Sequence, residues 1–133
     1  MSGQRQLTVW PEAEQALGVE PMDRYHARFV TLLEELATAG DDAFAGCFAR
    51  LRHETQKHFD QEQALMEQSA YPARHEHTDE HQRILGELTQ FQRRAERGLA
   101  AFARSYVRDS LSQWFPLHLV TMDAALAEHL QRD

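Results

Sequence analysis

The sequence contains one cysteine, few basic residues and no long apolar run. Cys47 cannot form an internal disulfide, which fits a reducing cytoplasm. No run of residues can span a bilayer, and the first ten residues lack the apolar core of a signal peptide, so we expect a cytoplasmic protein without membrane insertion. The 14 Lys and Arg against 21 Asp and Glu give a formal charge of −7, which leaves no electrostatic basis for binding nucleic acid.

Proline and glycine are also scarce, at four and six residues, and they fall mostly between the segments that have helical periodicity. Residues 1–20 are predicted to form an irregular arm, because Pro11 and Gly18 interrupt any helix there. Trp10 and Leu17 are the expected anchors of this arm on the rest of the protein.

Apolar residues recur at steps of three and four in the remainder of the chain, as they do in amphipathic helices. The four segments with this spacing run from Met22 to Leu36, from Phe44 to Leu65, from His77 to Ala95 and from Phe102 to Leu126. No alternating strand pattern is present in the sequence. The 133 residues are therefore predicted to form one all-α domain, with an antiparallel up-and-down four-helix bundle over residues 21–133.

Six polar residues occupy core-facing positions of these helices, namely His26, His58, Glu62, His77, His81 and His118. A single buried histidine is more often a satisfied core residue than a metal ligand. Six such residues on four helices need partners, because burying unpaired polar groups is costly. His77 and His81, one turn apart on one face, are a ready chelate. Counting about 1.5 Å per residue from the turns places the set in one layer of the bundle, which predicts a metal site.

Asp123 lies five residues after His118, which is about 140° around an ideal helix. Periodicity alone would therefore make Asp123 a surface acid. It can join the polar layer only where the helix is locally distorted. Pro116 supplies a cause, because a proline removes the hydrogen bond to the carbonyl of Ser112 and tends to kink a helix.

Four stretches together resemble the hemerythrin family in its bacterial single-domain form: Asp23-x-x-His26, His58-Phe59-x-x-Glu62, His77-x-x-x-His81 and Trp114-x-x-x-His118-x-x-x-x-Asp123. The resemblance covers nearly the whole chain, and it accounts for Asp123. It implies a non-haem di-iron centre with a bridging oxo or hydroxo group that binds dioxygen reversibly. Imidazole and carboxylate ligands suit iron in this role.

The resemblance also implies a role for each residue. His77, His81 and His118 would hold one iron, His26 and His58 the other, and Glu62 and Asp123 would bridge both. The iron with two histidines would then keep an open position for dioxygen. Phe29, Phe59 and Trp114 are expected to keep this pocket dry, and Thr121 is expected to place a hydroxyl beside it. His53, His75 and His129 are left over and are expected to be solvated.

The protein is expected to be an oxygen carrier or store rather than an enzyme. It is expected to be a monomer or a small homo-oligomer, and an oxygen-consuming enzyme is a candidate recipient of the oxygen. Sensing of oxygen, redox state or nitric oxide at the same centre is the alternative; the absence of an appended signalling domain in this chain favours the carrier. A second alternative is a zinc hydrolase that uses His77-x-x-Glu80-His81. That short motif leaves His26, His58 and Asp123 unexplained.

Overall fold

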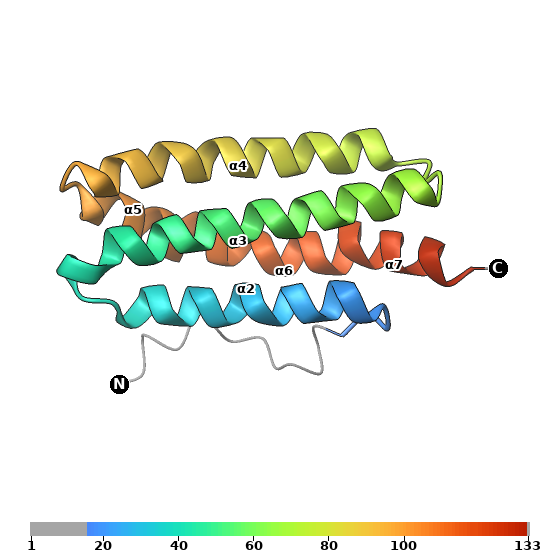
Figure 1. Cartoon of the computed structure of the whole chain (residues 1–133), viewed down its shortest axis with the longest axis horizontal. Helices are drawn as coiled ribbons and strands as arrows, with labels where there is room; N and C mark the ends of the chain where they lie inside the picture. The colour runs from blue at the N-terminus through green and yellow to red at the C-terminus, as the bar shows by residue number, and fades with distance from the viewer. Residues whose placement is uncertain (1–15, 133) are drawn as a thin grey trace.

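The computed structural model describes residues 16–132, and the predicted anchor Trp10 lies outside this range. Within the described residues the chain forms four long helices and no strand (Figure 1). They are α2 (Glu20–Thr38), α3 (Asp41–Gln68), α4 (Arg74–Glu96) and a fourth helix of five consecutive segments. These segments are α5 (Ala100–Tyr106), η2 (Val107–Leu111), α6 (Ser112–His118), η3 (Leu119–Asp123) and α7 (Ala124–Gln131). The prediction of an all-α four-helix bundle is confirmed.

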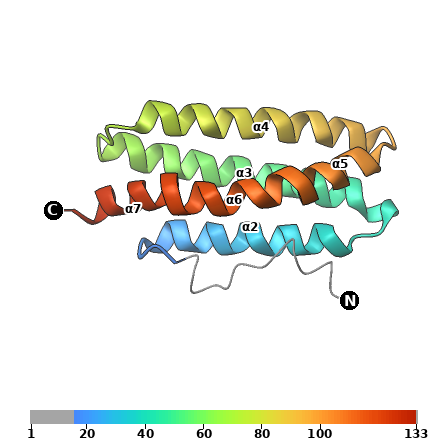
Figure 2. The same ribbon diagram turned by 180° about the vertical axis from the view of Figure 1, so that it is seen from behind.

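The helices alternate in direction and stand at the four corners of the bundle. α3 packs against both α2 and α4, and α4 also packs against the start of the fourth helix. In Figure 1 α3 crosses in front, and Figure 2 shows the fourth helix in front when the bundle is seen from behind. None of the described helices is long and apolar enough to cross a membrane.

The connections are short and have identifiable causes. Pro21 lies in the first turn of α2, where its missing N–H is not needed. Gly98, with a φ of 85°, makes the left-handed turn between α4 and α5 at no steric cost. Asp41 and Asp42 lie in the first turn of α3, where their charge favours the positive end of the helix dipole, but the residue that caps this helix is Gly40.

The predicted anchor Leu17 packs, half-buried, against the hydrophobic core. Asp23, in the first turn of α2, accepts hydrogen bonds from the backbone N–H of Leu17 at 2.7 Å and of Gly18 at 3.1 Å. The side chain of Gln131, at the end of α7, donates to the carbonyl of Leu17 at 3.1 Å. The end of the arm is therefore fixed to both α2 and the last turn of the bundle.

Two apolar clusters form the core, one on either side of a polar layer. The larger cluster includes Phe29, Leu51, Leu88 and Leu119. The smaller cluster lies where α2 begins and α3 ends, and it consists of Met22, Tyr25, Met66, Tyr71, Leu126 and Ala127. On α2, α3 and the fourth helix, the polar residues of the layer lie between members of the two clusters, and on α4 His77 and His81 lie between Tyr71, just before the helix, and Ile84. The layer is thus shielded from water at both ends.

The fourth helix differs from the predicted pattern at its first turn. Phe102 was expected in the core, but 56% of its surface is exposed, and Ala103, Tyr106 and Val107 are buried instead. The reason is that Phe102 and Val107 are five residues apart and cannot share one face of a regular α-helix. The guanidinium of Arg94 lies over the exposed ring, 5.9 Å from its centroid.

Candidate metal centre

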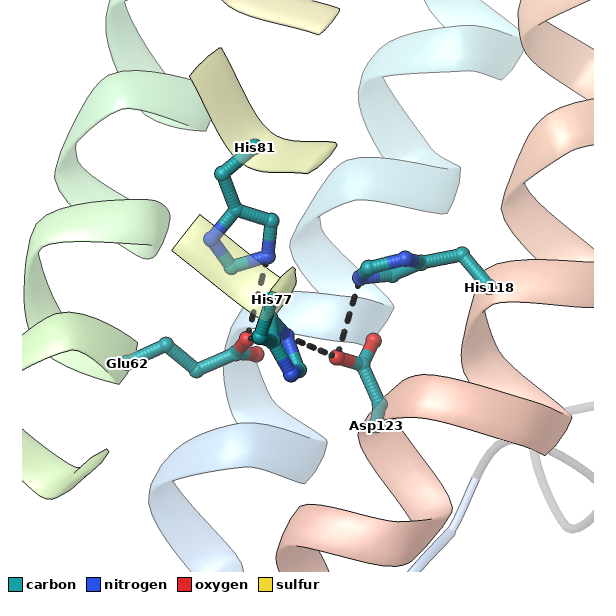
Figure 3. A group of neighbouring side chains, drawn as sticks. All are labelled: Glu62, His77, His81, His118 and Asp123. Atoms are coloured by element: carbon teal, nitrogen blue, oxygen red, sulfur yellow. Dashed lines mark hydrogen bonds and ion pairs between the residues drawn. The ribbon is translucent and has the colours of Figure 1, made fainter. Parts of the chain in front are cut away.

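Seven polar side chains from all four helices converge in the layer between the two apolar clusters. They are His26, His58, Glu62, His77, His81, His118 and Asp123, and none is more than 6% exposed. Figure 3 shows five of them pointing toward one another from α3, α4 and the fourth helix. The structure therefore brings together all seven residues of the predicted ligand set.

Glu62 lies at the centre of the layer and divides its neighbours into two sets. Its Oε1 lies 2.9 Å from Nε2 of His77 and 3.2 Å from Nε2 of His81. Its Oε2 lies 3.7 Å from Nε2 of His26 and 3.6 Å from Nε2 of His58. One carboxylate oxygen thus faces each pair of imidazoles.

Asp123 makes the same division from the opposite side. Its Oδ1 lies 3.1 Å from Nε2 of both His77 and His118, and its Oδ2 lies 3.0 Å from Nε2 of His26. We call the set His77, His81 and His118 the three-histidine half and the set His26 and His58 the two-histidine half. Both carboxylates lie between the halves, with one oxygen directed to each.

Asp123 reaches the centre because the helix is locally π-helical after His118. In η3 the backbone N–H of Ala124 donates to the carbonyl of Leu119, five residues earlier instead of four. A turn with this wider spacing places residues five apart, such as His118 and Asp123, on the same side. The predicted distortion is confirmed. Pro116 lies between η3 and a second π-helical segment, η2, while α6 continues through the proline.

The charges of the layer are balanced by hydrogen bonds to the carboxylates. Burial alone would lower the pKa of His26 and His77, but hydrogen bonds to Asp123 and Glu62 raise both pKa values to about 9. Burial dominates for His81, whose pKa falls to about 4. The histidines around Glu62 hold the pKa of its carboxyl well below the usual range, although burial opposes this. Without a bound cation, protonated histidines thus stabilise buried carboxylates.

Several buried polar atoms of the seven residues have no hydrogen-bond partner within the described part of the chain, despite these short distances. They are Nδ1 of His26, Nε2 of His81, both ring nitrogens of His118 and Oδ1 of Asp123. A buried polar atom without a partner destabilises a fold by about 1–3 kcal/mol. Cations between the imidazoles and carboxylates would satisfy three of these atoms, Nε2 of His81, Nε2 of His118 and Oδ1 of Asp123. The donor set of nitrogen and oxygen atoms without thiolate fits iron.

Aromatic rings enclose both halves. The ring of Phe59 stacks on His81 with centroids 3.7 Å apart, and Trp114 stacks on His118 at 4.5 Å. Phe29 lies 6.4 Å from the ring of His58. Phe29 and Phe59 are buried as predicted, whereas Trp114 is half-buried and covers the three-histidine half, away from the predicted open position.

Two aromatic residues at the two-histidine half were missed by the sequence analysis. Tyr25 stacks on His58 with centroids 4.0 Å apart and donates from its phenol to Oε2 of Glu62 at 3.0 Å. Phe115 lies 5.8 Å from the ring of His26. Helical spacing could have found both residues, because Tyr25 is four residues before the core residue Phe29 and Phe115 is three before His118.

Thr121 does not line the centre, so its predicted position was wrong. Its side chain is exposed, and its hydroxyl donates to the carbonyl of Leu117 at 2.6 Å. In a regular α-helix the residue three after His118 would share its face. The wider turn of η3 moves position 121 outward and turns Leu119 and Asp123 inward.

Glu80, the acid of the short hydrolase motif, is not part of the centre. It accepts a hydrogen bond from Nε1 of Trp114 at 2.6 Å and forms an ion pair with Arg83 at 2.9 Å. The hydrogen bond from Arg83, followed by that from Trp114, lowers the pKa of Glu80 to about 2. A carboxylate with these partners is a poor general base, which weighs against the zinc hydrolase.

Two of the three remaining histidines are solvated as expected, since His53 and His75 are exposed. The prediction for His129 was wrong. This residue is half-buried, and its Nε2 donates to the carbonyl of Ser69 at 2.9 Å. This bond joins α7 to the end of α3, because the last turn of the bundle packs against the turn that follows α3.

Comparison with known proteins agrees with this geometry. The family description "Hemerythrin HHE cation binding domain" matches residues 17–130. A curated bacteriohemerythrin of Ralstonia nicotianae is 35% identical over 121 residues, which are 91% of this chain and 87% of that protein. No solved structure gave a significant match. With both the sequence match and the cluster of buried histidines and carboxylates in place, the chain belongs to the hemerythrin family.

Proposed function

We propose that this protein binds dioxygen reversibly at a di-iron centre, as a carrier or store. In this proposal His77, His81 and His118 hold one iron, His26 and His58 hold the other, and Glu62 and Asp123 bridge them. The observation that carries the proposal is the division of both carboxylates between the halves, with one oxygen directed to each. The family match and the bacteriohemerythrin relative support it.

The donor count indicates where dioxygen would bind. The three-histidine half offers three nitrogens and two carboxylate oxygens, and the two-histidine half offers two nitrogens and two oxygens. If each iron takes six donors and the pair shares an oxo or hydroxo group, one position would stay open, in the two-histidine half. The iron pair would supply the electrons that reversible dioxygen binding requires.

The side chains around the two-histidine half suit a carrier rather than an oxidase. Phe29 and Phe115 are buried and cover it on the side of the larger apolar cluster, with ring centroids 4.8 Å apart. The phenol of Tyr25 donates its hydrogen bond to Glu62. Burial, and to a smaller extent the negative charge of Glu62, raises the pKa of this phenol far above its usual value. The pocket is therefore poor in protons that could drive the release of reduced oxygen species. An oxygen-consuming enzyme as recipient, a cytoplasmic location and a small assembly stay predictions from the sequence.

An optical spectrum of the iron-loaded protein tests the proposal. We expect two irons per chain, a coloured species on aeration of the reduced protein, and loss of that colour under vacuum. Azide should form a stable adduct with the oxidised protein. One zinc per chain after iron-replete expression would favour the hydrolase. Irreversible oxidation with release of peroxide would replace the carrier by an oxidase or a sensor.

Iron uptake by the metal-free protein should release about two protons per chain from its histidines near pH 7, in addition to the proton that water would release on supplying a hydroxo bridge. His26 and His77, with pKa values of about 9, carry protons at this pH, and a metal ion binds only the neutral imidazole. Titration of ferrous iron into weakly buffered, oxygen-free protein with a pH indicator measures this release. Release of no protons would show that the two histidines do not bind the metal. At pH 10 the release from the two histidines should largely disappear, which provides the control.

A further inference from the structure

A cavity of about 530 Å³ opens between α2 and α3, beside the centre but outside the set of seven residues except for His58. This volume falls within the range of about 300–1,000 Å³ that is usual for small-molecule sites. Its apolar walls include Phe29, Leu32 and Leu65. The lining spans residues 21–32 of α2, so the cavity is elongated over roughly 16 Å at 1.5 Å per residue. A linear apolar chain fits this shape better than a compact molecule.

The edge of the cavity is positively charged in a protein with a formal charge of −7. Arg24, Arg28 and Lys57 line it, against the single acid Glu54. Arg24 is paired with Glu20 on its own helix. Arg28 and Lys57 are exposed and form no ion pair within the part of the chain that the structure describes. Two free cations beside an apolar slot are complementary to a molecule with one anionic end and one apolar end.

We propose that this cavity binds a linear monocarboxylate of fatty-acid type. The carboxylate lies between Arg28 and Lys57, and the hydrocarbon chain packs against Tyr25 and Leu65, on one side of the two cations. Burial of the chain provides most of the affinity, and the two cations select the anion.

The buried wall of the cavity connects this site to the two-histidine half. Tyr25 and His58 both line it, and Tyr25 donates to Oε2 of Glu62 at 3.0 Å. A hydrocarbon chain against these two rings covers the approach to the two-histidine half from this side. Occupancy should therefore slow the entry of small ligands to the centre, a consequence that rests on the proposed function.

Binding of decanoate to the iron-loaded protein, measured by calorimetry, tests the site without use of dioxygen. We expect saturable binding of one decanoate per chain, weakened by added salt because the cations are exposed. Decanol, with the same chain and no charge, should bind about tenfold more weakly. Absence of saturable decanoate binding, or equal affinity for decanol, would overturn the proposal.

Two sets of variants locate the site. Arg28→Gln combined with Lys57→Gln should weaken decanoate binding about tenfold and leave decanol binding unchanged. Arg93→Gln combined with Arg97→Gln removes the same charge from exposed positions at the far end of α4 and should leave decanoate affinity within twofold. Ala64→Trp, at an exposed position of the lining, should block both ligands. Equal losses of decanoate affinity in the two double variants would show a non-specific effect of charge and overturn the proposed site.

Azide association with the oxidised iron-loaded protein tests the connection. Saturating decanoate should slow it at least fivefold, and the Ala64→Trp variant should be slowed without decanoate. Unchanged rates in both cases would remove the connection and leave the carboxylate site in place. Bound decanoate in a protein that takes up no dioxygen would instead refute only the proposed function.

Discussion

Replacing Glu62 with alanine is expected to reduce the bound iron from two ions per chain to fewer than one. Glu62 directs one oxygen to each half of the centre and lies within 3.7 Å of four imidazoles. The variant therefore removes a donor from both halves and one of the two negative charges that face the cations. Elemental analysis of protein purified from iron-replete cells measures the loss, and the colour on aeration should be lost with it.

Two further variants make this result interpretable. Glu62→Gln keeps the size of the side chain and removes its charge, so it should also lose iron while the helix content stays close to that of the wild type. Glu67→Ala removes an exposed carboxylate five residues along the same helix and should retain two irons. If the Glu62→Gln variant retained two irons per chain, the assignment of Glu62 as a bridging ligand would be wrong.

Removal of the metal should lower the melting temperature by roughly 10–20 °C. A ligand present at about 1,000 times its dissociation constant stabilises a fold by about 4 kcal/mol. Each kcal/mol corresponds to roughly 3–5 °C for a chain of this size. The centre lies between the two apolar clusters, so polar groups left without cations weaken contacts among all four helices. Thermal unfolding before chelation, after chelation and after return of iron measures the effect. Equal melting temperatures in the three states would contradict it.

The metal-free protein should also acquire a pH optimum of stability near pH 6.5. The pKa of His26 and of His77 is raised from 6.5 to about 9. The contribution of these two histidines to the free energy of unfolding is therefore complete below pH 6.5 and is lost as the pH rises to 9. The pKa of His81 is lowered to about 4, so stability is lost as the pH falls from 6.5 to 4. With iron bound, the loss on the alkaline side should disappear, because the ligating imidazoles are already deprotonated.

Within a regular helix, the sequence was sufficient to place the polar residues of the centre. His58 and Glu62 on α3, and His77 and His81 on α4, are each four residues apart and lie on the buried face of their helix, as predicted. This works because a helix with hydrogen bonds between residues four apart repeats every 3.6 residues, so hydrophobic spacing reports which side faces the core. The same spacing determined the four helices and their approximate limits.

Where the hydrogen bonding changes, the same reasoning fails. The π-helical turn of η3 brings Asp123 inward and sends Thr121 to the surface, against the order that a 3.6-residue period predicts. Nothing in the hydrophobic spacing marks this change, because it depends on which carbonyl each backbone N–H reaches. The resemblance to hemerythrins identified Asp123 and Pro116 indicated a local distortion, but only the structure showed that the distortion is a π-helical turn.

Contacts between helices were also decided by the tertiary structure. Periodicity places Tyr25 and Glu62 on the core faces of two different helices, but it does not give the hydrogen bond between them or the oxygen that accepts it. The bond from His129 to the end of α3 was missed for the same reason. The sequence by itself determined the helices, the buried faces of the three regular ones and the residue types that meet in the core. The division of the two carboxylates between the halves depends on how the four helices are packed, because each oxygen is oriented by imidazoles from helices distant in the sequence.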